Sequence, residues 1–434
     1  MTDKPSVSVV VLNYNGLHHL EECFGSLLNL GYPQDKVELI LVDNASKKNP
    51  AALMAEKYPS VKVILNDVNY GFARGSDIGA EAATGEYVAF LNNDTRVHPD
   101  WLTRLVEAIN EDEGLVCIGS RILNWEGDAI DFIGAQLNFY GHGFQESFRS
   151  RDTDKYKEPR EVLFACGGAM LIDRAVFLDV GGFDADYFAF FEDVDLGWRL
   201  WLFGYRVVLE PKAIVYHKHH GTASNLQSER KYVMYERNAL YTIIKNYDEK
   251  NLNKILPVAL LLAVKRGLVN AGTRKETYYL PDGAVVSGKK ATKPVIVREG
   301  VNAPEPELSA MEKISSSLKE EGFFATVGNV IRKVVATVTL GLISRGRRVP
   351  KGMDLVPRLG MAHFIGLDDV IENLTGVLEK RDLVQARRKR PDTEILRLFG
   401  APWKSNCLDP SYIAAQEDAV ASLGLDKLFR ESER

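Results

Sequence analysis

The sequence has 434 residues, of which 45% are hydrophobic and 26% are charged, and its formal net charge is -5. This composition excludes a disordered chain and argues against a nucleic-acid-binding protein, whose binding domain is usually basic. The four cysteines are scattered without a CxxC pair, so reduced thiols are favoured over disulfides or a zinc site. No signal peptide opens the sequence and no apolar stretch reaches the roughly 18 residues of a membrane-spanning helix. We therefore expect a cytoplasmic location.

Short apolar runs alternate with helical patterns over the first ~110 residues. Strand-like runs occupy residues 7–13, 37–42, 61–65 and 87–91, and helical spacing occupies 17–30, 49–58, 72–84 and 100–111. This alternation is typical of an α/β fold with a mostly parallel sheet. The strands are apolar throughout, which predicts that helices cover both faces of the sheet.

The rest of the sequence predicts more strands and then a helical region. We expect strands at 115–123, 161–172, 207–210 and 213–217, a mobile loop at 138–160, and a helix, a turn and a second helix over 174–203. Helical patterns follow at 228–247, 252–271 and 309–390, separated by a proline-containing loop or linker at 273–308. The predicted organisation is a first domain over residues 1–245 and a mainly α-helical region over 246–434.

Polar residues follow the first two predicted strands. The sequence VVVLNYNG at 9–16 places Asn13 and Asn15 after a strand, and LVDNAS at 41–46 places Asp43 after the next. Ligands bind in open α/β sheets at this carboxyl edge, where a carboxylate accepts hydrogen bonds from a base or a ribose. The alternatives are an ordinary Asn-Gly turn and a helix cap formed by Asp43 or Ser46.

Two further motifs come before and after the fourth strand. In NYGFARGSDIG at 69–79, glycines and Arg74 stand at a helix start, where a backbone can approach a phosphate closely. The glycine spacing matches neither a dinucleotide-binding nor a P-loop pattern. In FLNNDT at 90–95, Asn92 and Asp94 point the same way from the strand. A carboxylate and an amide oxygen suit a hard divalent cation that also holds a diphosphate, although an Asx-rich turn is the alternative.

Acidic and histidine clusters mark two later positions. FAFFEDVDLGWRL at 188–200 contains Glu192, Asp193 and Asp195 among aromatic residues. Crowded carboxylates near apolar rings have raised pKa values, which suits a general base, and acids complementing a helix dipole are the alternative. In VYHKHHG at 215–221 a strand runs into three histidines, one of which could complete a metal site with Asp94.

Taken in order, these motifs resemble glycosyltransferase family 2, and within it the bacterial rhamnosyltransferase-like enzymes, over about residues 5–245. The resemblance implies a GT-A-type fold, a nucleotide-sugar donor, and one displacement that inverts the anomeric carbon. It implies that Asp193 is the base, Glu192 positions the acceptor, and Asp94 and His217 bind Mg²⁺ or Mn²⁺. The donor-binding residues that it implies are Asn13, Asn15, Asp43, Asn69, Arg74, Asn92 and Asn93.

Two departures from the family pattern and two other functions have to be weighed. Asn92 replaces the first acid of the family's Asp-x-Asp, which weakens the metal site, and Ser76-Asp77 replaces asparagine residues, which bears on donor choice. The first departure leaves open a catalytically silent nucleotide-sugar-binding scaffold. A nucleotidyltransferase would need a glycine-rich, basic loop after the first strand, which residues 13–20 lack. A choice between His217, His219 and His220 as the metal ligand also stays open, with His217 favoured.

The expected partners are a nucleotide-sugar donor, such as dTDP-rhamnose or a UDP-sugar, and a glycan or polyprenyl-linked glycan acceptor of surface polysaccharide synthesis. Residues 255–271 and 323–348 are apolar with basic residues. They predict either peripheral association with the inner face of the cell membrane or core-facing helices and a homo-oligomer interface in the C-terminal region. No nucleic acid is expected as a partner.

Overall fold

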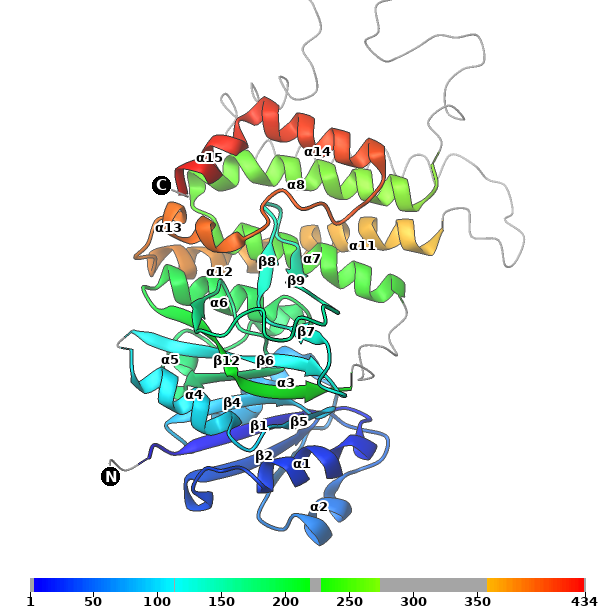
Figure 1. The fold of residues 1–434 in the computed structure, drawn as a ribbon. Coiled ribbons are helices and arrows are strands. Elements are labelled where there is room, and N and C mark those ends of the chain that lie inside the picture. The colour runs from blue at the N-terminus through cyan, green and yellow to red at the C-terminus, as the bar shows by residue number, and fades with distance from the viewer. Residues whose placement is uncertain (1–3, 113, 219–227, 274–356, 433–434) are drawn as a thin grey trace, which may run out of the picture.

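The computed structural model describes residues 4–112, 114–218, 228–273 and 357–432. Its strands are β1 Val7–Asn13, β2 Val37–Asp43, β3 Lys62–Leu65, β4 Tyr87–Asn92, β5 Thr95–Val97, β6 Leu115–Asn124, β7 Ile130–Phe132, β8 Ala135–Leu137, β9 Gly143–Gln145, β10 Arg160–Glu161, β11 Ala169–Asp173 and β12 Arg206–His217. One ten-stranded sheet has the order β10-β12-β6-β11-β4-β1-β2-β3, with β5 paired to β12 and β7 to β6. Figure 1 shows this sheet in one half of the molecule and a stack of C-terminal helices in the other.

Helices cover the sheet and then form the second half of the molecule. Those up to residue 202 are α1 Leu20–Leu28, α2 Ala51–Lys57, α3 Gly71–Ala82, α4 Trp101–Asn110, α5 Arg174–Asp179 and α6 Glu192–Leu202. Those that follow are α7 Ser228–Asn246, α8 Glu249–Asn270, α11 Arg358–Glu372, α12 Leu374–Ala386, α13 Asp392–Leu396, α14 Pro410–Leu423 and α15 Leu425–Ser432. Short 3₁₀ turns lie at Leu17–His19, Gln34–Lys36, Ala185–Tyr187 and Arg397–Phe399.

The first half of the sheet is parallel, as the sequence predicts. β1 pairs in parallel with β2 and with β4, and β2 pairs in parallel with β3. β1 is almost wholly buried, because helices lie on both faces and apolar side chains alternate between them. The register aligns Asn13 with Asp43 and Leu12 with Asn92. The carboxyl ends of three neighbouring strands therefore meet at one edge.

The second half of the sheet is mixed. β11 lies between β4 and β6 and is antiparallel to both, while β12 runs parallel to β6. The strand expected over 161–172 is two separate strands, β10 and β11, because a turn through Gly167 and Gly168 lies between them. The two strands expected at 207–210 and 213–217 are one strand, β12, with a register shift between Glu210 and Ile214. The α/β class with a mainly helical C-terminal region is confirmed.

The C-terminal helices pack on one another and on the sheet-bearing half. α11 packs against α7 and α8, and α12 packs against α7. Along α8 the apolar residues are largely buried, and Arg266 is buried in an ion pair with Glu236, so this helix takes the core-facing alternative. Most of the expected linker at 273–308, and the segment 323–348, lie outside the described residues.

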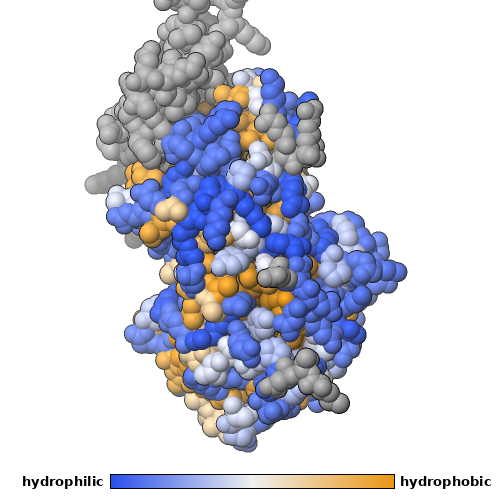
Figure 2. Space-filling view, turned by 90° about the vertical axis from the view of Figure 1, so that its left-hand side faces the viewer, coloured by the Kyte–Doolittle hydropathy of each residue, from blue (hydrophilic) through white to orange (hydrophobic). Residues whose placement is uncertain are grey.

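Hydrophilic residues predominate on the face of the molecule in Figure 2, with smaller apolar areas among them. Within the described ranges, no helix is long and apolar enough to cross a membrane.

Candidate active site at the carboxyl edge of the sheet

Three strand ends bring Asn13, Asp43 and Asn93 into one hydrogen-bonded cluster. The Asn13 amide donates to Asp43 Oδ1 at 2.6 Å, and the Asn93 amide donates to Asn13 Oδ1 at 2.6 Å. All three side chains are buried, so these bonds form where water competes little. The cluster is rigid and its polar groups are already oriented at the edge where the sequence predicts a nucleoside.

The loops after β1 and β2 are joined by hydrogen bonds around Ser46. Ser46 donates through its hydroxyl to Asp43 Oδ1 at 2.6 Å and through its backbone N–H to Asp43 Oδ2 at 2.9 Å. Asn15, which has a left-handed backbone with φ of 56°, accepts from the Lys47 N–H at 2.9 Å. The predicted helix cap is wrong, since α2 begins after Pro50 and neither Asp43 nor Ser46 caps it.

An open pocket of about 640 Å³ lies beside Asn15, within the size range of small-molecule sites. Its charged lining consists of two lysines and one glutamate. The sequence analysis did not identify these residues because they lie in a turn and at a helix start without a motif. The lining residues are Asn15, Leu17, His18, Glu21, Lys47, Lys48 and Leu53.

Asn69 and Arg74, the predicted donor residues around the start of α3, contact other groups of the protein. Asn69 accepts from the Gly71 N–H at 2.9 Å and so stabilises its own turn. Arg74 pairs with Glu81 along the outer face of α3 and is not brought to the Asn13 cluster. The helix instead packs closely on the sheet, because a Cβ at Gly79 would lie 2.3 Å from Val10. Gly79 therefore serves close helix–sheet packing.

Asp94 and His217 lie together at the end of β4. Asp94 Oδ1 is 3.2 Å from His217 Nε2, because the pairing of β5 with β12 aligns Thr95 with His217. Burial alone would raise the pKa of Asp94, but the adjacent His217 lowers that pKa below its ordinary value. Asn92 ends β4 with its amide nitrogen close to Gly168. His219 and His220 lie outside the described residues.

Asp131 on β7 holds the other nitrogen of the His217 ring, and the sequence analysis missed it. Asp131 Oδ2 lies 2.5 Å from His217 Nδ1. Burial lowers the pKa of His217, but hydrogen bonds to Asp131 and Asp94 outweigh burial and raise this pKa to about 10. A carboxylate behind a metal-binding histidine fixes the tautomer and orientation of the ring. No local motif marks Asp131, since β7 reaches His217 only through the sheet.

The Asp94–His217 pair would hold a divalent cation once His217 releases one ring proton, because only the neutral imidazole has a lone pair for a metal. Two ligands at right angles on an octahedral ion, each at roughly 2.1 Å, lie about 3 Å apart, which is close to the 3.2 Å between Asp94 Oδ1 and His217 Nε2. Across the described ranges no group of three or more His, Cys, Asp or Glu residues is arranged to hold a metal. A cation at this pair would therefore need further ligands, such as diphosphate oxygens and water.

Glu192 and Asp193 begin α6 beside the same edge. Burial, and secondarily the charge of Asp193, raises the pKa of Glu192 well above its ordinary value. Glu192 Oε2 is buried and has no hydrogen-bond partner among the described residues. Burial also raises the pKa of Asp193, although the Gly167 N–H donates to Asp193 Oδ2 at 3.1 Å. A carboxylate with a raised pKa takes up a proton more readily, which a general base requires.

The backbone that leads into this acid pair is strained. Phe188, Phe190 and Phe191 have φ values of 61°, 71° and 66°, in the left-handed region that bulky residues rarely occupy. Each such residue costs on the order of 1–3 kcal/mol and persists only where the surroundings enforce it. Strain of this kind concentrates at functional sites, which is consistent with the position of the acid pair.

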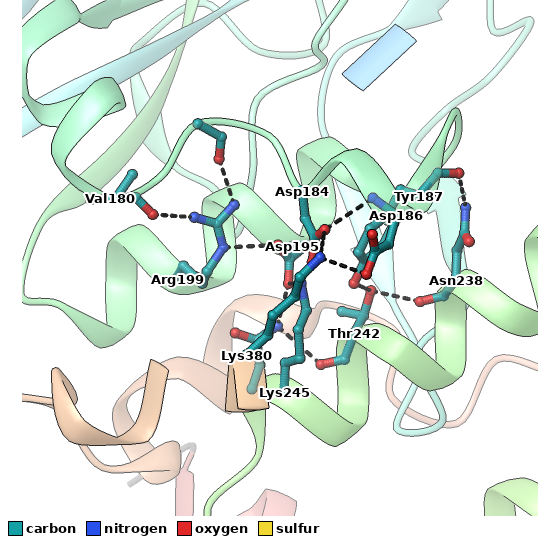
Figure 3. A network of polar contacts seen from close by, with 12 residues as sticks. Val180, Asp184, Asp186, Tyr187, Asp195, Arg199, Asn238, Thr242, Lys245 and Lys380 are labelled. Atoms are coloured by element: carbon teal, nitrogen blue, oxygen red, sulfur yellow. Dashed lines mark hydrogen bonds and ion pairs between the residues drawn. The ribbon is translucent and has the colours of Figure 1, made fainter. Parts of the chain in front are cut away.

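Asp195, the third carboxylate of the motif, belongs to a buried structural network (Figure 3). Arg199 Nε lies 2.8 Å from Asp195 Oδ2, and Lys245 Nζ lies 2.8 Å from Asp195 Oδ1. Lys245 and Lys380 also pair with Asp184; burial opposes its ionisation, but the two ammonium groups hold the pKa of Asp184 well below its ordinary value. The network joins α6 to α7 and α12, and it leaves Glu192 and Asp193 as the acids at the edge.

Residues 8–181 match the family model described as Glycosyl transferase family 2. The chain is 28% identical over 258 residues to the N-acetylglucosaminyl-diphospho-decaprenol L-rhamnosyltransferase of Mycobacterium tuberculosis, a match that covers 53% of this chain and 83% of the relative. It is 27% identical over 138 residues to glycosyltransferase AglE of Haloferax volcanii, covering 31% of this chain and 40% of that protein.

More distant similarities extend to animal proteins and to solved structures. Human polypeptide N-acetylgalactosaminyltransferase 14 is 28% identical over 227 residues, covering 50% of this chain and 41% of the relative. A crystal structure of GalNAc-T7 with UDP, GalNAc and Mn²⁺ superposes with a TM-score of 0.48 at 17% identity, covering 60% of this chain and 52% of that one. The chain thus spans less than half of the length of the archaeal and human relatives.

Proposed function

Residues 8–181 form a glycosyltransferase family 2 domain. We propose that the chain is an inverting, metal-dependent glycosyltransferase that uses a nucleotide-sugar donor. The observation that carries the proposal is the Asp94–His217 pair at the end of β4, 3.2 Å apart and backed by Asp131. We assign the reaction to residues 1–245, with the helical region over 246–434 as its support.

The proposed reaction is one displacement at the anomeric carbon. Asp193 takes the proton of the acceptor hydroxyl, and the hydroxyl oxygen forms a bond to the anomeric carbon. The bond from that carbon to the diphosphate oxygen breaks on the opposite face, so the configuration inverts. Glu192, adjacent to the base, positions the acceptor. The raised pKa of Asp193 supports this assignment, because a stronger base accepts the hydroxyl proton more readily.

The leaving group is a nucleoside diphosphate on which negative charge develops. Mg²⁺ or Mn²⁺ held by Asp94 and His217 would neutralise that charge. Asn13, Asn15 and Asp43 would orient the nucleoside from the loops after β1 and β2. Asn92 and Asn93 would complete the donor site, and Asn69 and Arg74 are retained as donor residues on the strength of the family pattern. For Arg74 this requires release from Glu81.

The donor and acceptor are proposed from the relatives. The mycobacterial relative is named as a rhamnosyltransferase that acts on a decaprenyl-diphosphate-linked sugar. We therefore propose dTDP-rhamnose as the first donor to test, with UDP-sugars next, and a glycan or polyprenyl-linked glycan of the cell envelope as the acceptor. Such an acceptor would bring the protein to the inner face of the membrane as a peripheral protein.

The test is donor binding followed by turnover. Thermal shifts of the full chain should be recorded with UDP-, dTDP- and GDP-sugars, each with and without Mn²⁺, since a ligand that binds the folded state raises its stability. We expect a shift that needs both Mn²⁺ and one nucleotide, and release of that nucleoside diphosphate in the presence of acceptor. A metal-dependent shift without turnover for any acceptor would favour a silent scaffold, which the replacement of the first metal-site acid by Asn92 also suggests.

A further inference from the structure

The loop at residues 187–191, here called the acid loop, leads directly into Glu192 and Asp193 at the start of α6. Residues outside the loop hold its conformation. We propose that Asn238 on α7 is the positioning residue that holds this acid loop in its left-handed conformation and so places Glu192 and Asp193. This inference rests on the proposed function, because it assigns those two acids to the reaction. Asn238 lies beyond residues 8–181 that match the family model.

The amide of Asn238 meets three carbonyl groups of the acid loop. Asn238 Nδ2 donates to the carbonyl oxygens of Tyr187 at 3.0 Å, Ala189 at 2.9 Å and Phe190 at 2.7 Å. The side chain is completely buried. An amide nitrogen carries two protons, so three carbonyl groups share them, and the loop must curl around this one atom. Figure 3 shows Asn238 reaching from α7 to Tyr187.

The orientation of that amide is itself fixed. Arg237 Nε donates to Asn238 Oδ1 at 2.9 Å, and Arg237 Nη2 donates to the Tyr187 carbonyl at 3.0 Å. A guanidinium has donors and no acceptor, so the oxygen of the amide faces Arg237 and the nitrogen faces the loop. Asn238 therefore acts as a donor toward the loop, a role that an aspartate of the same shape cannot fill.

The acid loop is also hydrogen-bonded to α3. The N–H groups of Phe72 and Ala73 donate to the Phe188 carbonyl at 2.6 and 3.2 Å. This approach requires glycine at position 71, where a Cβ would lie 2.3 Å from the Phe188 oxygen. The carbonyl groups of residues 187–190 can all point to donors on α7 and α3 because the backbone is left-handed at three of the five loop positions.

Loss of the Asn238 amide would remove the reason for this conformation. The partly buried Ala189 and Phe190 carbonyl groups would lose this donor, which is unfavourable, and the phenylalanine backbone is already strained. Both effects favour relaxation of the loop toward ordinary φ values. Because Phe191 is the residue directly before α6, relaxation would move the first turn of that helix, which carries Glu192 and Asp193.

The experiment compares Asn238→Ala and Asn238→Asp with Asn246→Ala. Asn246 is equally buried on the same helix, but its amide donates to Asp195 and to the Thr242 carbonyl instead of to the acid loop. Hydrogen exchange of residues 186–193 in the full chain reports the loop directly. Binding of UDP and dTDP with Mn²⁺ and the kcat of nucleoside diphosphate release report the site.

We expect both Asn238 variants to exchange faster in the loop and to lose at least about tenfold in kcat, with nucleotide Kd changed less than about twofold. Asn246→Ala should lower thermal stability without either effect. Loop exchange and kcat in Asn238→Ala that match Asn246→Ala would overturn the proposal. If Asn238→Ala does not fold, Asn238→Ser, which keeps one hydroxyl donor, provides the same comparison. If the Asn238 variants exchange faster in the loop but the wild-type protein releases no nucleoside diphosphate, the proposed function is refuted. The role of Asn238 in holding the acid loop is then still supported.

Discussion

Replacement of Asp131 should weaken the proposed metal site while leaving both proposed ligands, Asp94 and His217, unchanged. Asp131 is buried and lies 2.5 Å from Nδ1 of His217, which is partly buried at the sheet edge. Loss of a carboxylate behind a metal-binding histidine typically lowers metal affinity 10- to 100-fold, or about 1.4–2.8 kcal/mol. Asp131→Asn keeps an oxygen that can accept from the ring, so we expect about tenfold. Asp131→Ala removes the acceptor and should approach about 100-fold.

The assay is titration of Mn²⁺ into the protein with saturating nucleoside diphosphate, followed by calorimetry. Asp128→Asn and Asp128→Ala are the matched controls, because exposed Asp128 lies three residues away and contacts Asn124 rather than the histidine. These controls remove the same charge from the turn that leads into β7. If the Asp131 and Asp128 variants bind Mn²⁺ with the same affinity, Asp131 does not support His217 as a metal ligand.

Three other substitutions test the remaining assignments. Asp193→Asn should lower turnover by about 10²- to 10⁴-fold and leave nucleotide binding unchanged in calorimetry; near-normal turnover would disprove the base. Asp94→Ala should abolish the Mn²⁺ dependence of the donor-induced thermal shift, and an unchanged dependence would remove Asp94 from the site. Burial raises the pKa of Asp77 from 3.8 to about 7, so its stabilising contribution is full below pH ~4 and is lost as the pH rises toward ~7. The free energy of unfolding in urea should therefore be measured at pH 4 and pH 8 for wild type and Asp77→Asn. Between these pH values the variant should gain up to about 4 kcal/mol of stability relative to wild type. An equal change in the two proteins would contradict the raised pKa of Asp77.

The sequence was most informative where residues lie next to each other along one strand. The four N-terminal strands and their parallel pairing could be predicted from apolar periodicity. The common position of Asn13, Asp43 and Asn92 could be predicted because parallel strands end at one edge of the sheet. The pairing of Asp94 with His217 was also expected, although it depends on a sheet contact between residues more than a hundred positions apart.

Other features could not be predicted because they depend on tertiary contacts between distant segments. Asp131 reaches His217 only through the pairing of β7 with β6. Arg74 looks like a phosphate ligand in sequence, but its side chain pairs with Glu81 two turns along its helix. The antiparallel position of β11 carries no local signal, because a short buried strand has the same apolar pattern in either direction.

The carboxyl end of α7 limits how the sheet-bearing half of this chain could be fused to other proteins. Its last carbonyl groups are bound by side chains of the C-terminal region: Arg381 donates to Ile244 and Tyr247, both at 2.6 Å, and Gln385 donates to Lys245 at 2.7 Å. If the chain were cut after residue 247 and the first part fused to another protein, these carbonyl acceptors would have lost their donors. Asp184 would also lose its ion pair with Lys380. A chimaeric protein should therefore keep the sheet, α7 and the C-terminal helix α12, which binds the end of α7, from the same parent.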